Sequence, residues 1–318
     1  MNLLGLEIGG TKLQLVIGRE TGEIIDRRRF QVDRSAGGEG IRARIAQAAP
    51  ELIAQYQPQA IGVGFGGPVD WRTGRIASSH QITGWHDFEL GQWLQAQTGL
   101  PVAVDNDANV AALGEARQGA GRGFNPMFWI NMGSGVGGGL VVNGRIYHGA
   151  SPGEAEIGHV RLDKAGTLVE QRCSGWAVDQ RIREATALHP NGALGQLISN
   201  TQGGEARFLA PALAAGDELA HAIVSELADN LAFALSHVVQ LFHPQIIVVG
   251  GGLSLVGAPL RDALAAALPH YVMDSFQPGP PVALAGLRED SVPVGAILLA
   301  ANLGETAGQI RPSPELVL

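Results

Sequence analysis

Alternating and helical patterns of apolar residues succeed one another along the whole chain. Leu3–Ile8 has the apolar pattern of a buried strand, the pair Gly9-Gly10 that of a tight turn, and Leu13–Ile17 that of the returning strand. Further strands are predicted near 28–32, 60–65, 102–104, 128–131, 140–142, 245–249 and 282–284, and helices near 41–56, 90–97, 107–115, 217–242 and 294–303. Strands that alternate with helices and end in glycines predict an α/β fold that binds substrates at the strand ends.

Composition narrows the class of protein. The chain has 318 residues, 45% hydrophobic and 16% charged, which is enough for two lobes with sizeable cores. A net charge of −8 argues against a nucleic-acid partner. The densest basic run, Arg27–Arg29, has the pattern of a solvated strand edge. The N-terminus lacks the basic region of a signal peptide, and no window approaches the ~20 apolar residues that span a membrane, so we expect a cytoplasmic protein.

Glycine is unusually frequent and gathers in three turns. The 45 glycines are roughly twice the usual 7% share. The turns lie in Glu7–Lys12, Gly133–Gly139 and Gly250–Gly252, and their backbone N–H groups could bind a phosphate. Each turn taken alone could equally be an ordinary hairpin or strand–helix connection. A dinucleotide fingerprint is a weaker interpretation because "GSGVGG" leads into a strand instead of a helix, and no glycine run has the Gly-Lys-Ser/Thr ending of a Walker loop.

Six motifs occur in an order that resembles the ROK family of repressors, open reading frames and kinases: "EIGGTK", "GFGGPVD", "DNDAN", "GSGVGGG", "EIGH" and "IIVVGGG". The resemblance covers about residues 3–303. It implies the two-lobed, actin-like ATPase and sugar-kinase fold with ribonuclease H-like lobes and an active site in the cleft between them. The small lobe would be residues 1–108, completed by about 291–318, and the large lobe 109–290.

The resemblance also implies ATP with Mg²⁺, a hexose, and a homodimer or homotetramer. Asp107 matches the base that accepts the proton of the sugar hydroxyl, although an aspartate heading a helix could instead be its N-cap. Gly67, Asn106, Glu156, His159 and Glu170 match sugar-binding positions. The nucleotide would contact Glu7, Gly9, Gly10, Thr11, Lys12, Gly133, Ser134, Gly135, Gly251 and Gly252.

The chain departs from the family pattern at several positions. Glu7 stands where aspartate is usual and Gln81 where asparagine is common, so a contact near the metal and a contact near the sugar could both be altered. Family members carry a zinc-binding cysteine loop after the histidine of "EIGH", and that loop is missing here. One imidazole and one thiolate cannot complete a tetrahedral site, so we expect no structural zinc. Cys173 is then expected to be a small, partly buried apolar residue.

The shortened segment leaves two candidates for the carboxylate that follows His159. Matching "EQRCSG" selects Glu170, whereas preserving the loop length selects Asp179. Asp179 lies in a helical pattern, and we expect it to be an exposed residue paired with Arg183 at the i,i+4 distance.

These residues predict an ATP-dependent hexose kinase that is similar to glucokinases. Fructose, mannose and N-acetylhexosamines remain alternative substrates to glucose, and polyphosphate remains an alternative donor. A non-catalytic, sugar-sensing regulator on the same fold is the second interpretation, supported by Glu7, Gln81 and the missing loop. A nicotinamide oxidoreductase is disfavoured.

Overall fold

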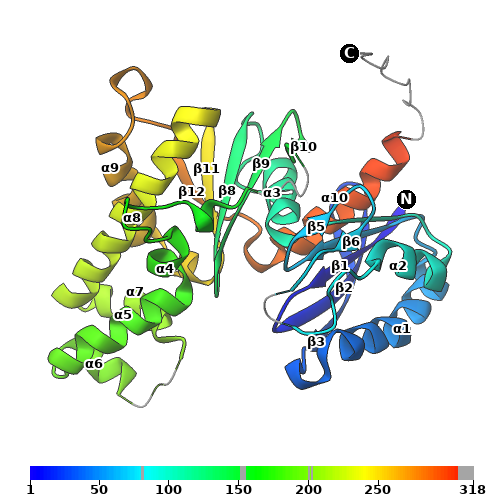
Figure 1. The fold of residues 1–318 in the computed structure, drawn as a ribbon, viewed down its shortest axis with the longest axis horizontal. Coiled ribbons are helices and arrows are strands. Elements are labelled where there is room, and N and C mark those ends of the chain that lie inside the picture. Colours follow the sequence, from blue (N-terminus) through cyan, green and yellow to red (C-terminus); the bar gives the residue numbers. More distant parts are fainter. Residues whose placement is uncertain (80–81, 151–154, 200, 202, 307–318) are drawn as a thin grey trace. The chain divides into compact units, whose positions relative to one another are not determined.

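The chain folds into two compact units, which are described separately. The computed structural model describes residues 1–79, 82–150, 155–199, 201 and 203–306 (Figure 1). The first unit is made of Met1–Gly114 with the chain from Val292, and the second of Glu115–Gly149 with the chain from Ala155 to Ser291. The sequence placed these divisions near residues 108 and 290. The divisions after Gly114 and after Ser291 fall within helices α3 (Asp107–Gln118) and α10 (Ser291–Thr306).

The first unit contains a five-stranded mixed sheet in the order β3-β2-β1-β4-β7. The strands are β1 (Asn2–Ile8), β2 (Lys12–Arg19), β3 (Ile24–Gln31), β4 (Ile61–Phe65) and β7 (Val102–Asn106). The first three strands pair antiparallel, whereas β4 and β7 run parallel to β1. The basic run Arg27–Arg29 lies on β3, which confirms the predicted edge strand. A small hairpin, β5 (Val69–Asp70) with β6 (Arg75–Ile76), follows β4.

Alternation along β1 sends consecutive side chains to opposite faces of this sheet. Leu4, Leu6 and Ile8 pack into one core with residues of α1 (Gly37–Tyr56) and α2 (Leu90–Thr98). Leu3 lies on the other face and joins a second core with Ile297 of α10.

Glycines on the α10 face explain part of the high glycine content. A Cβ built on Gly62 of β4 would lie 1.9 Å from the carbonyl oxygen of Ala296, and one on Gly295 would lie 1.8 Å from that of Val110. No side chain fits at such distances, so α10 contacts the sheet and α3 almost backbone to backbone. These glycines serve helix packing and not ligand binding.

The second unit repeats the same sheet topology with a different sequence. Its order is β10-β9-β8-β11-β12, with β8 (Met127–Met132), β9 (Val136–Val142), β10 (Arg145–Ile146), β11 (Ile246–Gly250) and β12 (Val282–Leu284). Again the first three strands are antiparallel and the last two run parallel to the first. The turn between β8 and β9 therefore corresponds to the turn between β1 and β2, and the glycines after β11 correspond to Gly66-Gly67 after β4.

Helices of the second unit surround the long helix α8 (Glu218–Phe242), as Figure 1 shows. They are α4 (Val169–Cys173), α5 (Gly175–Leu188), α7 (Leu209–Ala214) and α9 (Ala258–Ala267). Helix α6 (Ala193–Ile198) packs against α5 and α7. By length and composition α8 could cross a membrane, but 61% of its apolar window is buried inside the protein. Leu227, Leu231 and Leu235 are at most 3% exposed, so α8 is the central core helix of its unit.

The predicted long helices and strands are confirmed to within a few residues. The helix predicted from Asp217 starts at Glu218 because the Asp217 carboxylate accepts the N–H of Ala220 and caps the helix. The sequence pattern missed α9 and the shorter helices α4, α6 and α7. The last three have too few turns to give a recognisable period.

Candidate active site

The first glycine turn joins β1 to β2 and carries an ion pair. The N–H of Gly9 donates to the carbonyl of Lys12 at 3.0 Å, which closes the turn. Lys12 Nζ lies 3.0 Å from Glu7 Oε1, and Gln14 Nε2 donates to Glu7 Oε2 at 2.6 Å. Burial raises the pKa of Glu7 above its ordinary value, although Lys12 and Gln14 favour the ionised form.

These contacts bear on the metal role expected for Glu7. Lys12 occupies one carboxylate oxygen of Glu7 and Gln14 the other, so the arrangement does not fit a direct magnesium ligand. Among the described residues no group of three or more His, Cys, Asp or Glu could hold a metal ion.

The carboxyl ends of β4 and β7 bring three predicted residues together. Asn106 Nδ2 donates to the carbonyl of Gly67 at 3.1 Å. A Cβ built on Gly66 would lie 3.4 Å from Asp107 Oδ2, so the Asp107 carboxylate lies beside this loop. The N–H of Gly66 donates to Ile8 at 2.9 Å, which places the loop next to the end of β1.

The cap of α3 is Asn106. Its Oδ1 accepts the N–H groups of Ala108 at 2.9 Å and Asn109 at 3.3 Å, the bonds that define an N-cap. Asp105 Oδ1 in turn accepts the N–H of Asn106 and the amide of Asn109. The capping role that the sequence could equally have assigned to Asp107 therefore belongs to its neighbour.

The second glycine turn, between β8 and β9, is held by Glu170. Glu170 Oε2 accepts the N–H of Val136 at 2.9 Å, and a Cβ on Gly135 would lie 2.4 Å from the same oxygen. The N–H of Gly175, at the start of α5, donates to the carbonyl of Gly133 at 2.7 Å. Glu170 lies in α4, and its other carboxylate oxygen, Oε1, takes no part in the bond to Val136.

The "EIGH" motif packs against the backbone of β9 at Gly158. A Cβ on Gly158 would lie 2.3 Å from the carbonyl oxygen of Val136, so only glycine fits between Glu156 and His159. Both of those side chains are exposed. The chain then closes a tight hairpin, in which Leu162 N–H donates to Thr167 at 2.7 Å and Asp163 accepts the N–H groups of Gly166 and Thr167. The short connection after His159 is thus fastened by its own hydrogen bonds.

A cavity of about 560 Å³ joins the second and third glycine turns within this unit. Gly133 and Ser134 line it from the turn between β8 and β9, and Gly252 lines it from the turn after β11. Trp176 and Asp179 of α5, and Gly204 from a separate segment, complete the wall. The sequence gave no reason to place the last three at this cavity.

The two predicted glycines of the third turn have different surroundings. Gly251 has φ +80, and a Cβ there would lie 2.5 Å from the backbone of Met132. Gly252 begins the short 3-10 helix Gly252–Val256, and a Cβ there would meet nothing within 4 Å. Gly251 is therefore required by the fold, whereas Gly252 faces open space at the cavity.

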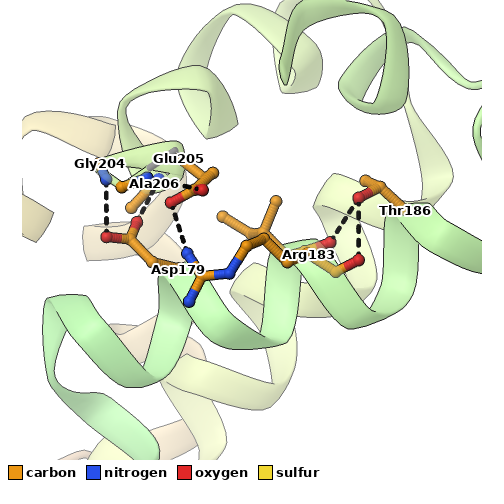
Figure 2. A network of polar contacts seen from close by, with 8 residues as sticks. Asp179, Arg183, Thr186, Gly204, Glu205 and Ala206 are labelled. Atoms are coloured by element: carbon orange, nitrogen blue, oxygen red, sulfur yellow. Dashed lines mark hydrogen bonds and ion pairs between the residues drawn. The ribbon is translucent and has the colours of Figure 1, made fainter. Parts of the chain in front are cut away.

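Asp179 is not the exposed helix residue that the sequence predicted. Its side chain accepts two backbone N–H groups, from Gly204 at 2.9 Å and Ala206 at 2.7 Å, and it is only 7% exposed (Figure 2). Arg183 instead pairs with Glu205 at 2.9 Å. The prediction was wrong because the i,i+4 spacing describes the helix alone, and the partners come from a segment about 25 residues away.

The remaining expectations concern Cys173 and Gln81. Cys173 is an apolar core residue, as predicted, but it is fully buried instead of partly buried, and burial raises the pKa of its thiol to about 12. Gln81 lies outside the described residues.

Two mixed α/β units of the same topology, each with a glycine hairpin at its first strand pair, define the actin-like class of kinases and ATPases. The ROK family model matches residues 3–302, and the chain belongs to the ROK family. The chain is 32% identical over 307 residues to a glucokinase of Halalkalibacterium halodurans, covering 92% of each chain. It is 30% identical over 304 residues to a glucokinase of Thermotoga maritima, covering 93% of this chain and 96% of the relative.

A solved structure supports the fold. It is a ROK glucokinase from Streptomyces griseus in complex with glucose and AMPPNP, 30% identical with a TM-score of 0.83. The match covers 95% of this chain and all of that chain. The predicted family and fold class are confirmed.

Proposed function

We propose that this protein is an ATP-dependent hexose kinase that transfers the γ-phosphoryl group of ATP to a hydroxyl of glucose or a related hexose. The observation that carries the proposal is the position of Asp107. It lies at the carboxyl end of β7 beside the loop at Gly66-Gly67, while Asn106 caps the helix. This position supports a role for the Asp107 carboxylate in proton transfer, because Asn106 already caps the helix.

The reaction needs one bond to form and one to break. The sugar oxygen attacks the γ-phosphorus of ATP, the bond to the bridging oxygen breaks, and ADP leaves. The proton of the sugar hydroxyl passes to a carboxylate oxygen of Asp107. Since phosphoryl transfer proceeds through a loose transition state, orientation and charge stabilisation contribute more than the strength of the base.

The nucleotide would bind in the cavity of the second unit. N–H groups of the turns at Gly133–Gly135 and Gly252 would donate to its phosphate oxygens. The relatives named glucokinases and the AMPPNP in the Streptomyces griseus structure support ATP as the donor. Magnesium enters as the substrate complex of ATP, and no residue described here is assigned as its ligand.

Candidate sugar-binding residues occur in each unit. Asn106 fixes the carbonyl of Gly67 in the first unit. Glu156 and His159 are exposed and able to bind sugar hydroxyls, and Glu170 would accept one through the oxygen that does not hold Val136. Glucose is the substrate that the named relatives support, and the assembly we propose is a cytoplasmic homodimer or homotetramer.

A coupled assay of ADP release over glucose, fructose, mannose and N-acetylhexosamines tests the proposal. We expect ATP- and sugar-dependent release, greatest with glucose. Binding of sugar without ADP release from any of them would instead favour the sugar-sensing regulator. Light scattering of the purified protein would give the number of subunits.

A further inference from the structure

We propose that Asp179 is a positioning residue for the nucleotide: it holds the segment 203–207, which forms one wall of the cavity, against helix α5. The inference rests on the proposed nucleotide site. It adds a residue that does not itself reach the phosphates and yet controls how tightly the nucleotide binds.

The carboxylate of Asp179 is used on both oxygens. Oδ2 accepts the N–H of Gly204 and Oδ1 accepts the N–H of Ala206, at 2.9 and 2.7 Å (Figure 2). Both donors are backbone groups, and both residues line the cavity. The bonds are charge-assisted, and their acceptor Asp179 is buried. Because both donors are backbone groups, the bonds fix the position of the wall and not merely that of a side chain.

A second contact from the same helix reinforces the first. Arg183 lies one turn further along α5 and donates to Glu205 Oε2 at 2.9 Å, while Glu205 Oε1 accepts the N–H of Gly203. Burial would raise the pKa of Glu205, but the hydrogen bonds from Gly203 and Arg183 outweigh it and hold the pKa below its ordinary value. The segment is thus tied to α5 through Gly204, Glu205 and Ala206 in succession.

The wall that is held in this way faces large exposed apolar groups. Trp176 is 60% exposed and lies three residues before Asp179, on the same face of α5. Leu255 is 74% exposed and lines the cavity from the segment that follows Gly252. A planar base between these side chains would cover apolar surface that otherwise faces water, and the small residues Gly204 and Ala206 leave room for it. The ligand class that fits is a nucleoside phosphate, with its base here and its phosphates at the glycine turns.

Asp217 provides a matched control. It is 9% exposed and accepts two backbone N–H groups, from Leu194 at 2.9 Å and Ala220 at 2.8 Å. Like Asp179, Asp217 is a buried carboxylate of the second unit that accepts two backbone N–H groups, but it does not line the cavity. Substitution of either aspartate should therefore lower stability, whereas only substitution of Asp179 should weaken nucleotide binding.

The test compares Asp179→Asn with Asp217→Asn in the full-length protein. An asparagine oxygen accepts one N–H, and its amide then faces the other, so each variant should melt at a lower temperature. We expect Asp179→Asn to raise the Kd for ADP and the KM for ATP about tenfold, with the sugar KM changed less than about twofold. For Asp217→Asn we expect both constants for the nucleotide to stay within about twofold of wild type.

The Kd for ADP, measured by calorimetry, tests nucleotide binding and the role of Asp179 separately. If wild-type protein does not bind ADP, the proposed function fails and this inference fails with it. If wild type binds ADP and Asp179→Asn binds it equally well, the inference alone is overturned. Should Asp179→Asn fail to fold, Arg183→Gln decides: the ADP Kd should rise about threefold, because Glu205 loses its cation, and an unchanged Kd overturns the proposal.

Discussion

The substitution Gly252→Ala should alter nucleotide binding without altering the stability of the fold. A Cβ at Gly252 meets no atom within 4 Å, so the substitution should change the free energy of unfolding by less than about 0.5 kcal/mol. The neighbouring Gly251→Ala should be far more damaging. Its backbone, with φ +80 and ψ 179, lies in a region that only glycine adopts readily, which costs another residue about 1–3 kcal/mol. The new carbon would also lie 2.5 Å from the backbone of Met132.

The effect of Gly252→Ala on catalysis follows from the proposed phosphate contact. A phosphate oxygen that accepts the N–H of residue 252 must come within about 3 Å of it, and a methyl group there would obstruct that approach. Loss of one hydrogen bond to a charged group costs ~1.5–3 kcal/mol, which is roughly a 10- to 100-fold rise in the KM for ATP.

The assay measures ADP release at saturating sugar over a range of ATP concentrations, with melting temperatures recorded alongside. We expect Gly252→Ala to melt like wild type and to show the raised KM for ATP, and Gly251→Ala to lose folded protein. A Gly252→Ala enzyme with the KM of wild type would show that the nucleotide does not approach this turn, and the reasoning would be refuted.

Three further changes test other parts of the site. Glu170→Gln keeps an oxygen for the N–H of Val136, so we expect an unchanged melting temperature and a sugar KM raised roughly 10- to 100-fold; an unchanged sugar KM would limit Glu170 to holding the glycine turn. Burial alone would raise the pKa of the Asp217 carboxyl, but the backbone N–H groups that it accepts stabilise the ionised form more strongly. The pKa of Asp217 in the folded protein is therefore below its ordinary value. The melting-temperature advantage of wild type over Asp217→Asn should therefore be complete above pH ~4 and disappear as the pH falls further, and an advantage that persists in acid would contradict this. Elemental analysis should find no stoichiometric zinc, and a chelator should leave the melting temperature unchanged; one tightly bound zinc per chain would show that the missing loop has been replaced by other ligands.

The sequence predicted the elements whose patterns are local and long. Strands β1, β4 and β11 and helices α1 and α8 stand out because their apolar residues repeat with one period over several turns or pleats. The repeated topology of the two units could not be predicted in this way, since topology depends on which strands pair and not on which residues recur. No fixed-period repeat in the sequence accompanies it.

The residues of the candidate site could be predicted from the sequence only where they belong to a recognisable motif. Asp107 and the glycine turns follow from ordered motifs, but the assignment of the helix cap to Asn106 required coordinates. Asp179 shows the reverse case. Its spacing from Arg183 indicated a surface pair, and tertiary contacts with Gly204 and Ala206 overrode that preference.

The high glycine content did not indicate which individual glycines serve packing and which serve binding. Gly62 and Gly295 lie where helices pack against backbone, Gly158 lies against β9, and Gly252 faces the cavity. The sequence shows the same residue in all four places. Only the surroundings of each missing Cβ distinguish packing from binding.

ADP release by wild type and Asp107→Asn, measured side by side with glucose and ATP, tests the central claim most directly. Asparagine keeps the shape of the side chain but accepts no proton, so we expect sugar affinity and melting temperature to be retained while kcat falls about 100-fold or more. A variant that turns over near the rate of wild type would contradict the account, because the proton of the sugar hydroxyl would then not pass to Asp107.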